Sequence, residues 1–282
     1  MRPSMPTLRA MNPTLTTADG LELRVREWPR ADARGSVLIV HGLGEHSGRY
    51  AHVAAQLNAW GWNAIGYDQR GHGASEGARG ALAQPDDLLR DLAIAIDAVR
   101  AKNPGPLVLL GHSMGGLVAA RFVAERLRSV DALVLSSPAL DTGMTAFQKL
   151  LLAVLGPLAP NLALGNGLKP EWISRDPAVV RAYVADPLVH DRITPRLARF
   201  FVDAGAFVAT RTARWSVPTL LLYAGSDRCV APAGSRAFAA AAPKAAVTVR
   251  EFASLFHEIF NEPEQREVFA VLGDWLSSGR GS

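Results

Sequence analysis

Residues 106–118 are Pro-Leu-Val-Leu-Leu-Gly-His-Ser-Met-Gly-Gly-Leu-Val: a short apolar run, a glycine-rich turn and a second apolar run. This pattern predicts a strand, a sharp turn and a helix, with Ser113 at the apex of the turn. Gly111 and Gly115 suit such a turn because its two arms pass close together. The turn strains its central residue and lifts the serine hydroxyl above the N-terminus of the next helix. A glycine-rich turn that only packs is the alternative interpretation.

The composition sets the class of protein. The chain has 282 residues, enough for one large α/β domain with an insertion or for two small domains. Its net charge is +4, but the basic residues are dispersed, so we do not expect a nucleic-acid partner. The single cysteine, Cys229, fits a reducing compartment, and residues 1–12 lack the apolar core of a secretory signal. We therefore expect a cytoplasmic protein without a membrane-spanning segment.

Strand-like and helix-like segments alternate along most of the chain. Strands are expected at 21–28, 36–40, 63–68, 107–111, 132–136, 218–223 and 246–252, and helices at 50–60, 85–102, 117–128, 233–241 and 263–276. The alternating polarity of 21–28 predicts an edge strand, whereas the continuous apolar run 36–40 predicts a central parallel strand. Together these segments predict an α/β fold, with a mainly parallel central sheet and helices on both faces.

The alternation stops for roughly seventy residues after the strand at 132–136. Apolar residues recur there at helical spacing, so we predict a helical cap at 139–211, inserted into a core formed by 1–138 and 212–282. The helix over 147–158 is apolar around much of its circumference. It either forms the wall of an acyl tunnel leading to the serine, with an outer face against lipid, or packs tightly within a small cap.

Reactive groups in open α/β sheets collect where strands end at the carboxyl edge. Ser113, Asp227 and His257 each follow a predicted strand, in the chain order of an α/β-hydrolase triad. A serine hydroxyl needs a base, and the imidazole of His257 suits that role near neutral pH. Asp227 would hold the other ring nitrogen, although Asp141 also follows a strand and competes for this role.

Backbone N–H groups complete the predicted chemistry. The negative oxygen of a tetrahedral intermediate needs donors that are already in place, and the N–H groups of Leu43 and Met114 are expected to supply them. The other histidines of the strand-end loops, at 41, 46, 72 and 112, lack the partners of a zinc site and are predicted to be hydrogen-bonded turn residues. Cys229 has no adjacent base and is predicted to be a small buried residue. We expect no metal and no cofactor.

Several blocks resemble the monoglyceride lipase and lysophospholipase branch of the α/β-hydrolases, also labelled serine aminopeptidase S33-like. The blocks are His41-Gly-Leu-Gly-Glu-His-Ser-Gly-Arg-Tyr50, the loop 67–77, the elbow 111–116, and the cap segments 160–165 and 183–188. The resemblance covers nearly the whole chain. It implies the α/β-hydrolase fold, the triad Ser113, Asp227 and His257, and the oxyanion donors Leu43 and Met114.

The resemblance also implies a substrate. It suggests Glu45, Arg49 and Tyr183 as polar groups near the glycerol end of a lipid ester. Independently of the resemblance, the tunnel interpretation of the 147–158 helix places Phe147, Leu151 and Leu155 against the acyl chain. It makes the cap the candidate for peripheral contact with a membrane or micelle. Animal monoglyceride lipases carry a second histidine three positions after the catalytic one, whereas this chain has Phe260.

The expected activity is hydrolysis of a carboxylic ester through an acyl-enzyme, with monoacylglycerols or related single-chain lipid esters as substrates. Cleavage of lysophospholipids, small aryl esters or peptides on the same triad remains open. A hydrolase fold that only binds a ligand is the alternative from another class. Epoxide hydrolysis and dehalogenation need an aspartate at the elbow, which Ser113 excludes.

Overall fold

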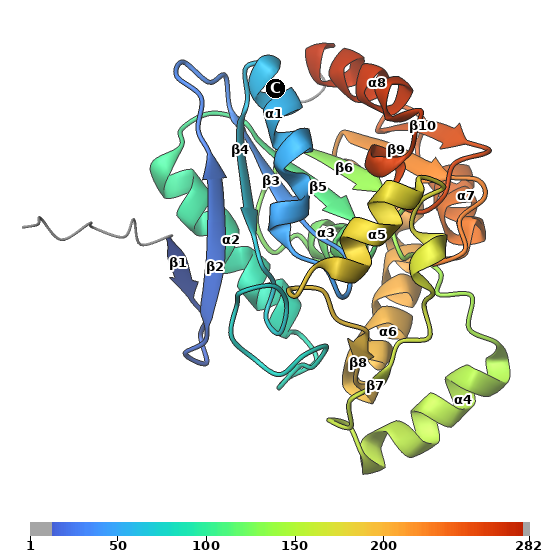
Figure 1. The fold of residues 1–282 in the computed structure, drawn as a ribbon. Coiled ribbons are helices and arrows are strands. Elements are labelled where there is room, and N and C mark those ends of the chain that lie inside the picture. The colour runs from blue at the N-terminus through green and yellow to red at the C-terminus, as the bar shows by residue number, and fades with distance from the viewer. Residues whose placement is uncertain (1–12, 279–282) are drawn as a thin grey trace, which may run out of the picture.

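The computed structural model describes residues 13–278 (Figure 1). Residues 1–12, for which no secretory signal is predicted, lie outside the described residues, as do 279–282. The main sheet has eight strands in the order β1-β2-β4-β3-β5-β6-β9-β10. The strands are β1 Thr14–Thr16, β2 Glu22–Trp28, β3 Ser36–Val40, β4 Asn63–Tyr67, β5 Leu107–His112, β6 Ala132–Ser136, β9 Thr219–Ala224 and β10 Val247–Phe252.

From β4 to β10 all neighbouring strands are parallel, which confirms the mainly parallel sheet. β2 pairs antiparallel with β4, and β1 pairs antiparallel with the other side of β2. The prediction that 21–28 forms the edge strand is therefore wrong. Thr14-Leu-Thr16 covers part of the outer side of β2. The turn between the two strands is closed by the Thr17 N–H, which donates to the Leu21 carbonyl at 2.8 Å.

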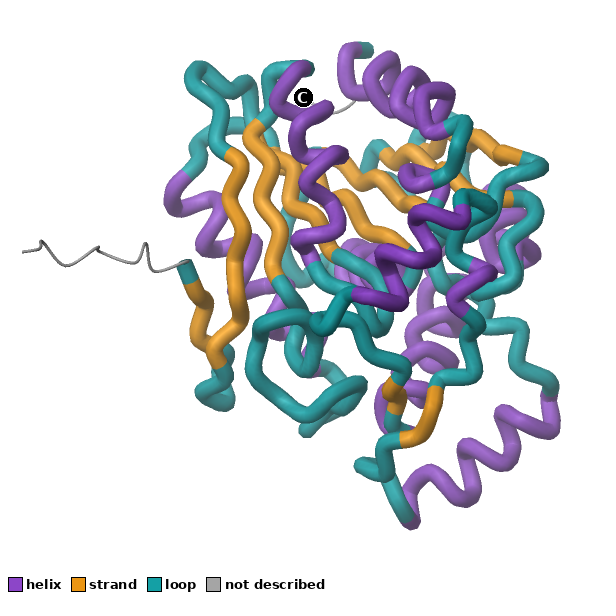
Figure 2. Tube along the Cα trace, viewed as in Figure 1, coloured by secondary structure: helices purple, strands orange, loops and turns teal. Residues whose placement is uncertain are grey.

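Helices cover both faces of the sheet (Figure 2). α1 (Ala51–Ala59) and α8 (Gln265–Ser277) pack on one face; α2 (Asp87–Lys102), α3 (Met114–Glu125) and α7 (Pro232–Ala241) pack on the other. The central strand β3 is buried along its whole length, and its alternate side chains enter the two apolar clusters. This explains its uninterrupted apolar sequence.

The segment between β6 and β9 contains three α-helices: α4 (Ala146–Leu155), α5 (Pro177–Ala185) and α6 (Pro195–Arg211). It also holds a two-stranded sheet of β7 (Leu164–Gly165) and β8 (Arg192–Ile193), which the sequence analysis does not predict. Short 3₁₀ turns occur at Ser47–Tyr50, Gly156–Leu158, Pro170–Trp172, Thr212–Arg214 and Ile259–Asn261. In Figure 1, α4 extends away from the sheet at the lower right.

The helices of this segment do not pack alike. The apolar face of α6, including Leu197, Phe200 and Ala204, belongs to the same buried cluster as α3. α4 has a Thr145–Gln148 capping box at its start, but none of its described side chains belongs to that cluster. The division into a core (1–138 and 212–282) and a cap (139–211) thus stays a prediction. Within the proposed cap, α6 is the helix that packs most deeply against the core. None of the described helices is both long and apolar enough to cross a membrane.

Candidate active site

Ser113 lies between β5 and α3 in a backbone conformation that side chains rarely adopt, with φ 52° and ψ −118°. Such a conformation costs about 1–3 kcal/mol and persists only where the surroundings enforce it. The surroundings here are tight. A Cβ at Gly115 would collide with the carbonyl oxygens of Val40 and His41, at the end of the neighbouring strand. The glycine is therefore required by close packing of two backbones beneath the serine.

His257 and Asp227 come from the loops that follow β10 and β9. Nδ1 of His257 lies 2.7 Å from Oδ2 of Asp227. The other carboxylate oxygen accepts the N–H groups of Cys229 at 2.8 Å and Val230 at 3.1 Å. Both oxygens of Asp227 are thus engaged, and the carboxylate has a fixed orientation toward the imidazole.

The charges of this pair stabilise each other. Burial by itself disfavours the imidazolium, but the Asp227 carboxylate outweighs it and raises the pKa of His257 above its usual value. Burial likewise opposes the charged form of Asp227, and the facing imidazole lowers the pKa of that carboxyl below its usual value. The Asp227 carboxylate therefore stabilises the imidazolium that forms when His257 takes a proton from another group.

His112, which precedes the serine, lies against the same histidine. The ring centroids of His112 and His257 are 4.7 Å apart. Burial and the neighbouring His257 lower the pKa of His112 to about 4, so it is neutral at pH 7. Its Nδ1 lies 3.1 Å from the Ser136 hydroxyl, so His112 is hydrogen-bonded as predicted, but it is the last residue of β5 and does not lie in a turn.

The structure distinguishes Asp227 from Asp141, the other candidate for the acid of the triad. Asp141 accepts the N–H of Gly143 at 2.9 Å and lines a different cavity, together with Thr142 and Lys149. It contributes to neither the cavity at Ser113 nor the hydrogen bonds of His257. Of the two candidate acids, the structure brings only Asp227 to the imidazole.

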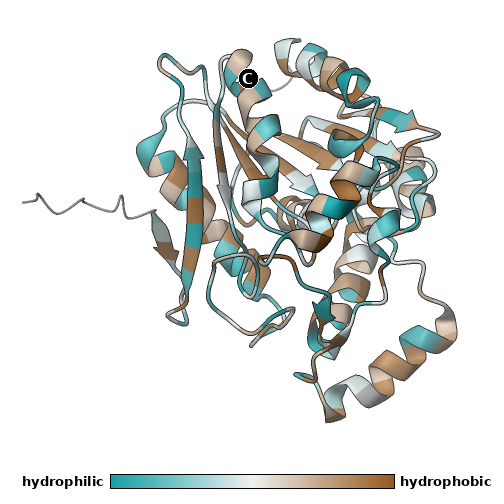
Figure 3. Ribbon diagram, viewed as in Figure 1, coloured by the Kyte–Doolittle hydropathy of each residue, from teal (hydrophilic) through white to brown (hydrophobic). Residues whose placement is uncertain are grey.

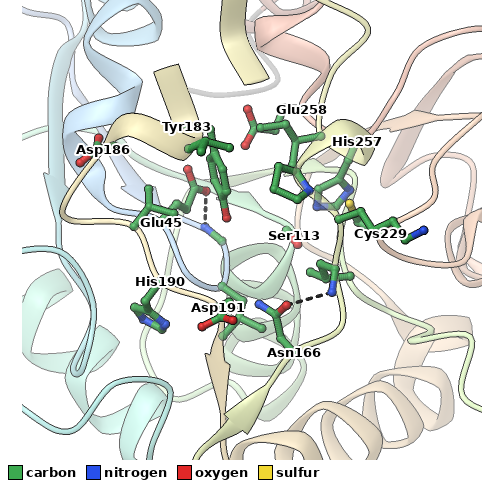
Figure 4. A pocket seen from close by; sticks show the side chains of 18 of the residues that line it. Glu45, Ser113, Asn166, Tyr183, Asp186, His190, Asp191, Cys229, His257 and Glu258 are labelled. Atoms are coloured by element: carbon green, nitrogen blue, oxygen red, sulfur yellow. Dashed lines mark hydrogen bonds between the residues drawn. The ribbon is translucent and has the colours of Figure 1, made fainter. Parts of the chain in front are cut away.

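A cavity of about 320 Å³ opens at Ser113 (Figure 4). Its lining contains Gly42, Leu43, Glu45, His112, Ser113, Asn166, Leu168, Lys169, Pro170, Ile173, Tyr183, Val184, Asp186, Val189, His190, Asp191, Cys229, His257 and Glu258. Figure 4 shows the side chains of Ser113, His257 and Glu45 gathered around this space. One part of the wall is polar, whereas Leu168, Ile173 and Val184 give the other part an apolar surface.

The loop after β3 is held from two sides. Gly42 N–H donates to Glu45 Oε1 at 2.6 Å, and the Gly44 carbonyl accepts His190 N–H at 2.9 Å. Gly44 has φ +77°, and a Cβ there would collide with the His190 carbonyl. Leu43, between them, lines the cavity. Met114 is the first residue of α3, where an N–H has no acceptor within the helix.

A buried group of charges lies beside this loop. Arg49 donates to Glu45 at 2.7 Å and, through both terminal nitrogens, to Glu258 at 2.5 and 2.7 Å. The guanidinium also covers the ring of Tyr183 at 4.8 Å. Burial alone would raise the pKa of Glu45, but Arg49 holds it below its usual value. Among these residues, Glu258 could not be predicted from the sequence, because a single acidic residue after His257 has no distinguishing pattern.

The predicted acyl contacts on α4 are not brought to this cavity. Phe147 and Leu151 do not line it and are 71% and 46% exposed. The side chain of Leu155 lies outside the described part of the structure. An acyl contact at Phe147 and Leu151 therefore stays a prediction, because α4 extends away from the sheet and does not reach this cavity. The apolar wall comes instead from segments 168–173 and 184–189, which the sequence analysis does not predict.

Asp227, Cys229 and His257 are the one cluster in the described part of the chain whose donor atoms could hold a metal, all lying within 4.8 Å of one another. The donor set does not fit. His257 Nδ1 and Asp227 Oδ2 are hydrogen-bonded to each other, so neither atom is free to coordinate a metal. Burial raises the pKa of the Cys229 thiol, which keeps it protonated, whereas a metal ligand and a nucleophile both need the thiolate.

The parallel sheet, the strained serine between β5 and α3, and a histidine after the last strand define an α/β-hydrolase. The chain belongs to the family described as serine aminopeptidase, S33, whose model matches residues 31–264.

Individual relatives agree with this family. A monoacylglycerol lipase of Mycolicibacterium smegmatis is 36% identical over 89% of this chain and 90% of its own. Phospholipase YtpA of Bacillus subtilis is 32% identical over 83% of this chain and 91% of its own. The crystal structure of a monoacylglycerol lipase of Paleococcus ferrophilus is 36% identical, with a TM-score of 0.83 over 91% of this chain and 99% of the other.

Proposed function

We propose that this protein is a monoacylglycerol lipase that cleaves its ester through an acyl-enzyme on Ser113. As a carboxylic ester hydrolase it needs a nucleophile, a base and a site for the acyl group. The observation that carries the proposal is the meeting of the strained serine and the His257–Asp227 pair at one cavity. The monoacylglycerol lipases among its relatives, which match nearly the whole chain, supply the substrate class.

The reaction follows from the roles of these groups. Ser113 Oγ attacks the ester carbonyl carbon while its proton passes to Nε2 of His257. Asp227, held at Nδ1, stabilises the imidazolium that results. The imidazolium then protonates the departing glycerol oxygen, which leaves the acyl group on Ser113. Water, deprotonated by the same imidazole, releases the fatty acid and restores the serine.

The backbone N–H groups of Leu43 and Met114 are proposed to bind the negative oxygen of both tetrahedral intermediates. One donor of this kind contributes about 3–4 kcal/mol to transition-state stabilisation. Leu43 lies in the loop that Glu45 and His190 hold, and Met114 lies at the N-terminus of α3. The positive end of the helix dipole adds to the attraction of the oxygen.

The cavity suits an amphiphilic ester. Tyr183 and Glu45 are proposed to face the glycerol end, and the apolar side chains of 168–173 and 184–189 to face the acyl chain. Arg49 has its terminal nitrogens engaged by two carboxylates, so it is proposed to act on glycerol only through Glu45.

The exposed apolar side of α4 supports a second part of the proposal, contact with a lipid surface. Phe147, Leu150 and Val154 of α4 are 71%, 60% and 59% exposed, and Leu158, just beyond it, is 80% exposed. Figure 3 shows α4 coloured mostly as hydrophobic. Removing such side chains from water favours adsorption by about 25 cal/mol per Å² of apolar surface.

Vesicle sedimentation tests this contact. We expect Phe147→Ser combined with Leu158→Ser to release the protein from phosphatidylcholine vesicles while leaving hydrolysis of a short soluble ester unchanged. Leu127→Ser, at an exposed leucine at the end of α3, is the matched control and should bind as the parent does. Equal binding of the double variant and the parent would contradict contact through α4.

The similarity to a phospholipase favours lysophospholipid hydrolysis as a second candidate. A panel of monoacylglycerols, lysophospholipids, aryl esters and aminoacyl amides, each assayed with the parent and with Ser113→Ala, separates the candidates. We expect the highest kcat/KM on monoacylglycerols and loss of all activity in Ser113→Ala. Highest turnover of lysophospholipids would favour the second candidate. A folded protein with no turnover of any ester would favour a binding protein.

A further inference from the structure

Arg49 lies in a buried network between two carboxylates. Its Nη1 is 2.7 Å from Glu45 Oε2 and 2.5 Å from Glu258 Oε1, and its Nη2 is 2.7 Å from Glu258 Oε2. Both glutamates are buried, at 4% and 6% exposure. A two-pronged contact of this kind fixes the guanidinium in orientation as well as position. We call Glu45, Arg49 and Glu258 the carboxylate–arginine bridge.

The bridge joins two loops that are distant in the sheet. Glu45 lies in the loop after β3 and accepts the N–H of Gly42 at 2.6 Å. Glu258 lies in the loop after β10 and directly follows His257 in the chain. Between β3 and β10 the sheet contains β5, β6 and β9, so no strand pairing connects the two loops. The bridge supplies a direct connection.

Both glutamates are held in place. Glu45 Oε1 also accepts the Tyr50 hydroxyl at 2.7 Å, and Glu258 Oε2 accepts the side-chain amide of Asn261 at 2.8 Å. The Glu258 N–H donates to the Ile173 carbonyl at 2.8 Å. Both carboxylate oxygens of Glu258 are thus hydrogen-bonded within the protein, as expected of a residue that positions its neighbours.

We propose that Glu258 and Arg49 are positioning residues that hold the loop of His257 in register with the loop of Leu43. The base and the oxyanion donor must reach the same reacting carbonyl, one on each side, and the bridge fixes the distance between the loops that carry them. This inference rests on the proposed function, because it takes His257 as the base and Leu43 as an oxyanion donor.

The bridge also has an electrostatic effect. Two carboxylates and one guanidinium leave it with one net negative charge beside the imidazole. The groups that face His257 are Asp227 from the β9 loop, Glu258 from its own loop, Glu45 from the β3 loop, and the neutral His112 and Cys229. Removing the Glu258 charge removes one attraction for the imidazolium, so His257 should stay neutral to a lower pH.

The test uses Glu258→Gln, which keeps the size of the side chain but removes its charge. We expect kcat to fall roughly 10- to 100-fold, the scale of a misplaced reacting group, with a smaller change in KM. The acidic limb of the kcat/KM profile should move to lower pH. Glu258→Asp keeps the charge but shortens the reach, so it should lower kcat while leaving the acidic limb in place.

The matched control is a second buried bridge. Asp91 binds Arg70 at 2.6 Å, is 1% exposed and does not line the cavity. Asp91→Asn removes a comparable buried charge and should lower the melting temperature without moving the acidic limb. A limb that moves as much in Asp91→Asn as in Glu258→Gln would show a general effect of net charge and overturn the inference.

Ser113→Ala separates the inference from the proposed function. If Ser113→Ala is inactive while Glu258→Gln and Glu258→Asp both retain kcat within twofold, the bridge does not position the base, and the proposed function stands. If Ser113→Ala remains active, the proposed function is contradicted, and the inference that rests on it is contradicted as well. A variant that does not fold is replaced by Arg49→Lys, which cannot make the two-pronged contact and should lose kcat to a similar extent.

Discussion

Replacing Asp227 by asparagine tests the geometry of the proposed triad. The Oδ1 position accepts the N–H groups of Cys229 and Val230, so it must remain an oxygen in the variant. The amide nitrogen then takes the Oδ2 position, 2.7 Å from Nδ1 of His257, and donates to it. The imidazole proton is forced onto Nε2, where it faces Ser113. In that tautomer His257 cannot accept the serine proton.

The size of the effect follows from this tautomer. An asparagine at the acid position of a serine triad lowers kcat roughly 10⁴-fold, which corresponds to about 5.4 kcal/mol in the activation free energy. Release of p-nitrophenol from a short-chain ester measures kcat over this range. The backbone contacts of residue 227 remain, so circular dichroism should show a folded protein.

Asp141→Asn is the control, because Asp141 lines another cavity and should keep kcat within about twofold. Two results would refute the reasoning. One is a kcat for Asp227→Asn above a tenth of the parent value. The other is a loss in Asp141→Asn as large as the loss in Asp227→Asn, which would make Asp141 the acid.

Three further predictions follow from single features. His257 must be neutral to act as the base, and Asp227 raises its pKa above the usual 6.5. We therefore expect kcat/KM to rise with pH as His257 loses its proton, with the midpoint of the rise above pH 6.5. A flat profile from pH 5 to 8 would contradict this. Gly44→Ala should lower kcat roughly 10- to 100-fold through collision with the His190 carbonyl, whereas Gly20→Ala, also at positive φ but in open space, should not. Phe122→Ala, at a fully buried position, should lower the free energy of unfolding by about 3–5 kcal/mol in a denaturant titration, and a loss under 1 kcal/mol would contradict that.

Local patterns predict much of the core fold. The elbow at 111–115 can be predicted because a serine flanked by glycines between a strand and a helix has few other uses. The parallel strands can be predicted from their continuous apolar runs. The short β1 cannot, since three residues of Thr-Leu-Thr carry no periodicity, and its omission made β2 look like an edge strand.

The residues that form the cavity wall could not be predicted from the sequence. Helical spacing of apolar residues predicts α4 as a helix but does not say where its apolar side points. In the structure that side is exposed. The wall is formed by 168–173 and by 184–189, which includes the end of α5. Glu258 is missed for a related reason. Its partner Arg49 is 209 positions away, and no local pattern connects them.

The central claim is that Ser113 is the nucleophile that the His257–Asp227 pair activates. Its most direct test is labelling of the folded protein with a fluorophosphonate, followed by mass spectrometry of the peptides. The account predicts one covalent adduct, on Ser113, that is absent from Ser113→Ala and strongly slowed in Asp227→Asn. An unmodified Ser113 in folded protein, or an adduct on another residue that persists in Ser113→Ala, would contradict it.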